Sequence, residues 1–69
     1  MAKLKINGQE RDFPTGLPAT LKELLAQLNV DEATVVAEVD GRIVRRDDFG
    51  STPLQQGQAI ELVRLVGGG

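Results

Sequence analysis

The sequence contains no cysteine and no histidine. These absences exclude disulfide bonds and thiol nucleophiles, and they remove the commonest metal ligands. A small chain without disulfides fits a reducing compartment. The sequence also lacks a glycine loop of the Walker type, so nothing in it predicts nucleotide chemistry carried out by the chain itself.

Neither sign of charge dominates, since 8 Lys and Arg residues stand against 10 Asp and Glu residues, a net charge of -2. Without a basic stripe, nucleic acid is not an expected partner. The first residues contain no long apolar run. We therefore expect neither a signal peptide nor a membrane span, and we expect the protein in the cytoplasm.

What is present indicates one small folded domain. Of the 69 residues, 41% are apolar and 26% are charged, which is typical of globular chains. A domain of this size buries only about 60% of the surface that its unfolded chain exposes. There is little room for a deep substrate cavity.

The N-terminal segment predicts a β-hairpin. Residues 3–6 alternate polar and apolar side chains, which is the period of a half-buried strand. Asn7-Gly8 follows and favours a type I′ turn, because both central residues of that turn need a positive φ angle. Residues 9–13 form the returning strand, and a loop with prolines and glycine follows.

One helix is expected next. Thr20 and Glu23 form a capping box, in which the Thr20 hydroxyl accepts from the Glu23 amide and the Glu23 side chain reaches back to the Thr20 amide. The helix is expected to end near Asn29, which tolerates the left-handed conformation just past helix ends. The leucines between these residues lie on one helical stripe: Leu21, Leu24, Leu25 and Leu28.

A second strand pair and a final strand follow. Residues 35–39 predict a strand, Asp40-Gly41 a tight turn and Ile43-Val44 a short return. An irregular stretch with a helical turn near Pro53 and a last strand over residues 59–66 complete the elements.

This order of elements favours an α+β fold, with one helix packed on one face of a small mixed sheet. The first and last strands would pair in parallel at its centre, as in a β-grasp (ubiquitin-like) domain. A barrel without a docked helix would leave the leucine stripe uncovered. The predicted core consists of Leu4, Ile6, Phe13, Leu21, Leu24, Leu25, Leu28, Val39, Ile60 and Leu62.

The sequence ends in Gly67, Gly68 and Gly69. We expect residues 1–66 to form the domain and residues 67–69 a flexible tail. Taken alone, such a tail is most simply a frayed terminus. Three extended glycines also span about 10 Å and have no Cβ, so they can enter a narrow channel and present a terminal carboxylate to a partner. Adenylation by ATP would activate that carboxylate for displacement of AMP by sulfur.

Residues 54–69 resemble the C-terminus of the ThiS family, whose last strand ends in a hydrophobic residue followed by glycines. Asn7-Gly8, the leucine-rich residues 21–25 and residues 39–44 are also similar, so the resemblance covers essentially the whole chain. It departs from the family pattern at three positions, which we interpret as turn and surface differences: Arg45 in place of proline, Phe49 in place of an aromatic that is often tryptophan, and Gln58 in place of aspartate.

The resemblance implies a sulfur carrier and not an enzyme. A ThiF-type enzyme would use Mg-ATP to adenylate Gly69, while Gly67 and Gly68 would thread the tail into its site. Sulfur from a cysteine desulfurase system would give the Gly69 thiocarboxylate, and a ThiG-type thiazole synthase would receive that sulfur for thiamin. No cofactor is expected on this chain, because ATP and magnesium belong to the activating partner.

The last strand also predicts a partner surface. Its side chains alternate, so Ile60 and Leu62 are expected to face the helix, because the charged residue between them is costly to bury. Val63 and Leu65 then lie on the opposite face, where Val36 joins them. Incidental surface hydrophobics are the simpler interpretation, but a patch beside the tail favours partner binding.

Three other functions stay open. A MoaD-like subunit of molybdopterin synthase would share the activation chemistry, and the short chain and its glycine ending favour ThiS over it. A ubiquitin-like modifier would join Gly69 to lysines of target proteins. An interaction domain with an inert tail would form no adenylate at all.

Overall fold

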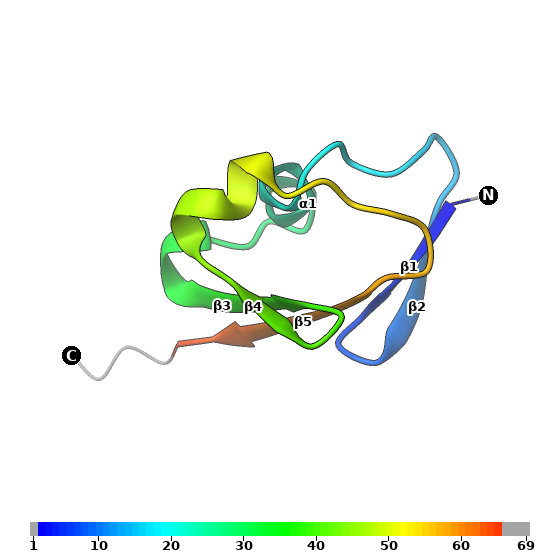
Figure 1. Ribbon diagram of the computed structural model, residues 1–69. Coiled ribbons are helices and arrows are strands. Elements are labelled where there is room, and N and C mark those ends of the chain that lie inside the picture. The colour runs from blue at the N-terminus through cyan, green and yellow to red at the C-terminus, as the bar shows by residue number, and fades with distance from the viewer. Residues whose placement is uncertain (1, 66–69) are drawn as a thin grey trace.

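The computed structural model describes residues 2–65 (Figure 1). None of the helices in this part of the chain has the length and apolar character needed to cross a bilayer. The elements, in chain order, are β1 (Ala2–Ile6), β2 (Gln9–Phe13), α1 (Leu21–Gln27), the 3-10 helix η1 (Glu32–Thr34), β3 (Val35–Val39), β4 (Arg42–Val44), the 3-10 helix η2 (Arg46–Ser51) and β5 (Ala59–Arg64).

The strands form one mixed sheet in the order β2-β1-β5-β3-β4. At its centre β1 runs parallel to β5, with Lys5 opposite Ala59 and Ile6 opposite Ile60. The other neighbours pair in antiparallel fashion. Both α1 and η2 lie over the same face of the sheet (Figure 1). This arrangement confirms the predicted β-grasp fold.

Both tight turns have type I′ character, which the sequence predicted for Asn7-Gly8. The φ angles are 51° at Asn7 and 83° at Gly8, and 50° at Asp40 and 83° at Gly41. The first residue of each turn also holds β5. Asn7 accepts a hydrogen bond from the Leu62 amide at 2.7 Å, and Asp40 accepts one from the Ala59 amide at 2.9 Å. The turns therefore fix the position of the last strand.

The capping box of α1 is partly as predicted. The Thr20 hydroxyl accepts from the Glu23 amide at 3.3 Å, but the Glu23 carboxylate accepts from the amide of Ala19 and not of Thr20, at 2.9 Å. Thr20 is extended, with φ -138° and ψ 167°, and this brings the preceding amide to the carboxylate. Asn29, with φ 59°, follows the helix end as predicted.

The core lies between the sheet and α1. Most of the predicted core side chains are buried, while Ile6, Leu28 and Leu62 are partly buried and pack against them. Val35 and Ala37 are buried as well, because β3 directs alternate residues to the helix face. The buried apolar residues are Leu4, Phe13, Leu21, Leu24, Leu25, Val35, Ala37, Val39, Phe49 and Ile60.

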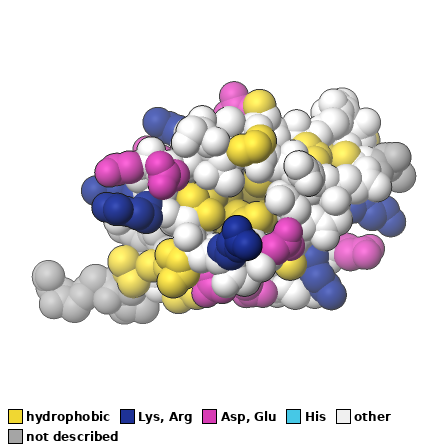
Figure 2. Space-filling model, in the orientation of Figure 1, with side chains coloured by type: hydrophobic (Ala, Val, Ile, Leu, Met, Phe, Trp, Pro, Cys, Tyr) yellow, Lys and Arg dark blue, Asp and Glu magenta, His cyan; other side chains and the backbone are white. Residues whose placement is uncertain are grey.

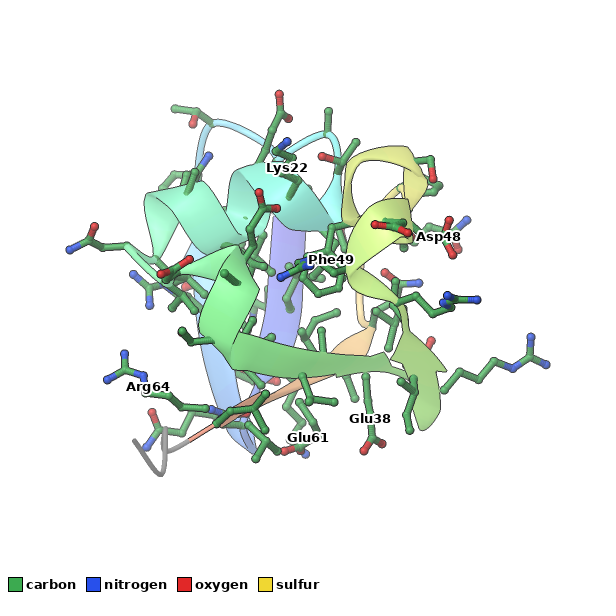
Figure 3. All side chains as sticks on the ribbon, turned by 90° about the vertical axis from the view of Figure 1, so that its left-hand side faces the viewer. Lys22, Glu38, Asp48, Phe49, Glu61 and Arg64 are labelled. Atoms are coloured by element: carbon green, nitrogen blue, oxygen red, sulfur yellow. The ribbon has the colours of Figure 1, made fainter. Side chains whose placement is uncertain are left out.

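Phe49 corrects the sequence analysis, which placed it at the surface. Its side chain is 1% exposed and points from η2 into the interior (Figure 3). The helical turn spans Arg46–Ser51, upstream of Pro53, which forms an isolated bridge with Thr20. A 3-10 helix has three residues per turn, so only one side chain in three points inward, and in η2 that side chain is Phe49. Arg45 is exposed, as expected.

Candidate functional site

The candidate site begins where β5 leaves the sheet. Backbone pairing with β3 extends to Val35 opposite Arg64, and the Leu65 amide donates to the Thr34 carbonyl at 2.7 Å. Backbone hydrogen bonds therefore fix the position of the chain as far as Leu65, its last described residue. Gly67, Gly68 and Gly69 lie outside the described residues, so their roles, and the boundary between domain and tail, stay predictions.

The side chains of β5 alternate as predicted. Ile60 is fully buried and Leu62 is half-buried on the helix face. Val63 is 55% exposed on the opposite face, which we call the outer face of the sheet. Leu65, one residue beyond β5, is 54% exposed. Val36 lies opposite Val63 on β3 and is half-buried.

The sequence analysis missed one apolar member of this surface. Ile43 of β4 lies opposite Glu38 and is 69% exposed. The type I′ turn could have revealed it, because a two-residue loop pairs Val39 with Arg42 and therefore the residues on either side of them. Hydrophobic side chains gather near the C-terminal end of β5 (Figure 2). We call Val36, Ile43, Val63 and Leu65 the outer patch.

Two carboxylates lie within the outer patch, and the sequence analysis missed their pairing. Glu38 of β3 and Glu61 of β5 are directly opposite in the antiparallel register. Both side chains extend from the face of the sheet opposite α1 (Figure 3). The ion pairs found among residues 2–65 are Lys3–Glu10 and Lys22–Glu32, so neither carboxylate has a cation of the described chain within 4.0 Å.

A basic cleft adjoins the same end of β5. It encloses about 300 Å³ and opens to solvent, and its lining includes Leu65, two arginines and one aspartate: Arg45, Arg46 and Asp47. Among the residues described, no cluster of three or more acidic, histidine or cysteine side chains is arranged to hold a metal ion. The described surface therefore offers an apolar and acidic face beside a basic cleft, an arrangement suited to docking a protein next to the end of β5.

Comparisons with known proteins agree with this fold. Two curated relatives are both named thiazole synthase: the chain is 36% identical to one from Paramagnetospirillum magneticum and 33% identical to one from Magnetococcus marinus, each over 67 residues. The alignments cover 97% of this chain and 20% of each relative. The chain therefore spans about a fifth of the length of the curated relatives it matches.

Solved structures and a family model lead to one assignment. The crystal structure of the thiamine biosynthesis protein ThiS from Geobacter metallireducens is 31% identical, with a TM-score of 0.83 over 97% of this chain and 99% of that one. The solution structure of a thiamine biosynthesis protein from the same organism is 31% identical, with a TM-score of 0.79 over 97% and 87%. The model of the ThiS family matches residues 4–69. The chain belongs to the ThiS family.

Proposed function

We propose that this protein is a sulfur carrier of thiamin biosynthesis, and that it bears its sulfur as a thiocarboxylate on Gly69. The observation that carries the proposal is the family match, which extends over residues 4–69 and so includes the glycine ending. The β-grasp fold and its likeness to a solved ThiS structure support it. The protein is then a cosubstrate, and its partners perform the catalysis.

The chemistry requires a free carboxylate on Gly69. A carboxylate oxygen attacks the α-phosphorus of ATP, and pyrophosphate leaves as the acyl adenylate forms. A sulfide sulfur then attacks the carbonyl carbon, the bond to the phosphate oxygen breaks, and AMP leaves with that electron pair. A ThiF-type enzyme with Mg-ATP would catalyse activation. A cysteine desulfurase system would supply sulfur as a persulfide, which a thiol reductant would reduce to the level of sulfide. The lack of cysteine supports a reducing compartment, the cytoplasm.

A thiazole synthase is the proposed recipient of the sulfur. In two relatives that bear this name, a segment similar to this chain makes up about a fifth of the protein. We further propose that Val36, Val63 and Leu65 contact the partner enzymes. The exposure of Val63 and Leu65 and their position next to the end of β5 support that role.

The direct test is the intact mass of the protein after incubation with Mg-ATP, a sulfur source and the activating enzyme. The expected gain is about 16 Da, because SH replaces OH in the acyl group. No gain is expected when ATP is omitted. A protein that forms isopeptide-linked products through Gly69, without this gain, would instead be a modifier. A protein that forms no adenylate would contradict the proposal.

A further inference from the structure

The outer face of the sheet carries charge in two different arrangements. On its β1–β2 half, opposite charges face each other: Lys5 lies opposite Glu10, and Lys3 forms an ion pair with Glu10 at 3.9 Å. On its β3–β5 half, like charges face each other, because Glu38 lies directly opposite Glu61. One half of this surface therefore pairs opposite charges, whereas the other half places like charges side by side.

The opposed carboxylates work against the stability of the isolated domain. Side chains directly opposite in an antiparallel pair have Cβ atoms about 4.5–5.5 Å apart, and like charges at that distance repel. The cations of β1 on this face are Lys3 and Lys5, and the nearer one in register, Lys5, lies opposite Ala59, two residues before Glu61. Solubility alone does not require two like charges at this position. A single charge, or an opposite-charge pair such as Lys5 and Glu10, would keep the surface polar without repulsion.

Apolar side chains surround the carboxylate pair. Ile43 lies beside Glu38 on one side, and Val36 and Val63 form the next cross-strand pair along β3 and β5. A protein that covers these exposed apolar groups must also remove water from the carboxylates. Burying carboxylates without a counter-charge is strongly unfavourable, because the charges lose their hydration. Any partner that docks here therefore has to supply a cation at this point.

We propose that Glu38 and Glu61 together bind an arginine that projects from an apolar surface of the thiazole synthase. The planar fork of N–H donors in a guanidinium can bond to both carboxylates at once, which a single ammonium point charge does less well. Such a contact turns the repulsion of the free domain into attraction in the complex. The inference rests on the proposed function.

One observation makes this face accessible to a partner enzyme, and a second favours the synthase as that partner. The outer patch reaches Leu65, the last described residue, so a protein that acts on the residues beyond it can also cover this face. The two relatives named thiazole synthase contain a segment similar to this chain, which places that segment next to the rest of a synthase. The activating enzyme is the other candidate occupant, and the experiment separates the two.

The test uses Glu38→Gln, Glu61→Gln and the double variant, titrated calorimetrically into purified thiazole synthase of the same organism. Each single substitution should weaken binding by roughly tenfold or more, since it removes one partner of an interfacial charge contact. The double variant should also bind with a smaller dependence on salt. In the free double variant, the melting temperature should rise, because the repulsion between the strands is removed.

The matched control is Glu10→Gln combined with Asp12→Asn. It changes the net charge equally on the same outer face, at the half where β1 and β2 pair. It should alter the affinity for the synthase by less than about twofold, since exposed charges away from a contact act only through screened, long-range attraction. An equal loss of affinity in the control would show general steering by charge and would overturn the proposal.

Unchanged binding of the Glu38/Glu61 double variant to the synthase would also overturn it, even if binding to the activating enzyme weakened. The same holds if the wild-type protein does not bind the synthase. These outcomes are distinct from failure of the proposed function. The gain of about 16 Da requires the activating enzyme and no synthase, so its loss contradicts the sulfur carrier itself.

Discussion

At the scale of single residues, two side chains from neighbouring elements fill the core. Leu24 lies on the buried stripe of α1 and is 0% exposed, while Phe49 reaches the same cluster from η2 and is 1% exposed. Phe49 is the largest of the fully buried side chains. Because a domain this small has one core, the loss of either side chain acts on the whole fold.

Leu24→Ala should destabilise the domain by roughly 2–5 kcal/mol, because it removes buried methyl groups and leaves a cavity. The free energy of unfolding from chemical denaturation measures this loss. An unchanged denaturation midpoint would show that Leu24 does not lie in the core.

Phe49→Ala should cost a comparable or larger amount, about 3–5 kcal/mol, for the same reason. Ile43→Ala is the control, since its side chain is 69% exposed and surface substitutions usually stay within about 0.5 kcal/mol. Equal denaturation midpoints for the two variants would contradict the buried position of Phe49 and restore the surface assignment.

At the scale of elements, the sequence predicted those with a local signal. The dipeptides Asn7-Gly8 and Asp40-Gly41 specify their own turn type, and the leucine stripe of α1 repeats with the helical period. No such repeat exists in η2, where a short 3-10 segment buries one side chain. Local sequence therefore gave no reason to bury Phe49.

The candidate site also divides into features that local sequence predicted and features that it could not predict. Alternation along the last strand was enough to predict that the side chains of Val63 and Leu65 are exposed. The pairing of Glu38 with Glu61 could not be predicted, because it depends on the register between strands that are distant in the sequence. The reactive role of Gly69 was inferred from the family resemblance. Gly69 lies outside the described residues, so no distance or contact supports that role.

A substitution on β5 tests the outer patch as an interface. Val63→Asp should weaken the complex with the partner enzymes, because it places a charge on an apolar contact beside two carboxylates. Val63→Thr keeps the shape without the charge and should retain most of the affinity. Circular dichroism should show that both variants are folded. If the folded Val63→Asp protein binds as tightly as the wild type, Val63 is an incidental surface residue.

At the scale of the whole molecule, the fold holds the last strand at the centre of the sheet. β5 is the central strand, and two turn side chains, Asn7 and Asp40, hold it from its neighbours. The outer patch lies along the same strand and reaches Leu65. In the proposed function, the fold thus combines a docking face with a reactive terminus on the same chain end.

Deleting Gly69 should abolish activation, because the carboxylate then ends about 3.3–3.6 Å short and reacting groups must lie within roughly 3–3.5 Å. Gly68→Val should also fail, since a β-branched side chain does not fit a channel shaped for glycine. The measurement is the intact mass after incubation with Mg-ATP, a sulfur source and the activating enzyme. Both variants should keep the melting temperature of the wild type, whereas a lowered one would indicate a structural role.

The most direct test of the central claim is to locate the sulfur by fragmenting the intact, sulfurated protein in the mass spectrometer. We predict that the additional mass of about 16 Da, from exchange of OH for SH, appears only in fragments that contain Gly69. It should be absent from every N-terminal fragment that ends at Gly68 or earlier. Additional mass in a fragment that lacks Gly69, or in the protein from which Gly69 has been deleted, would contradict the account.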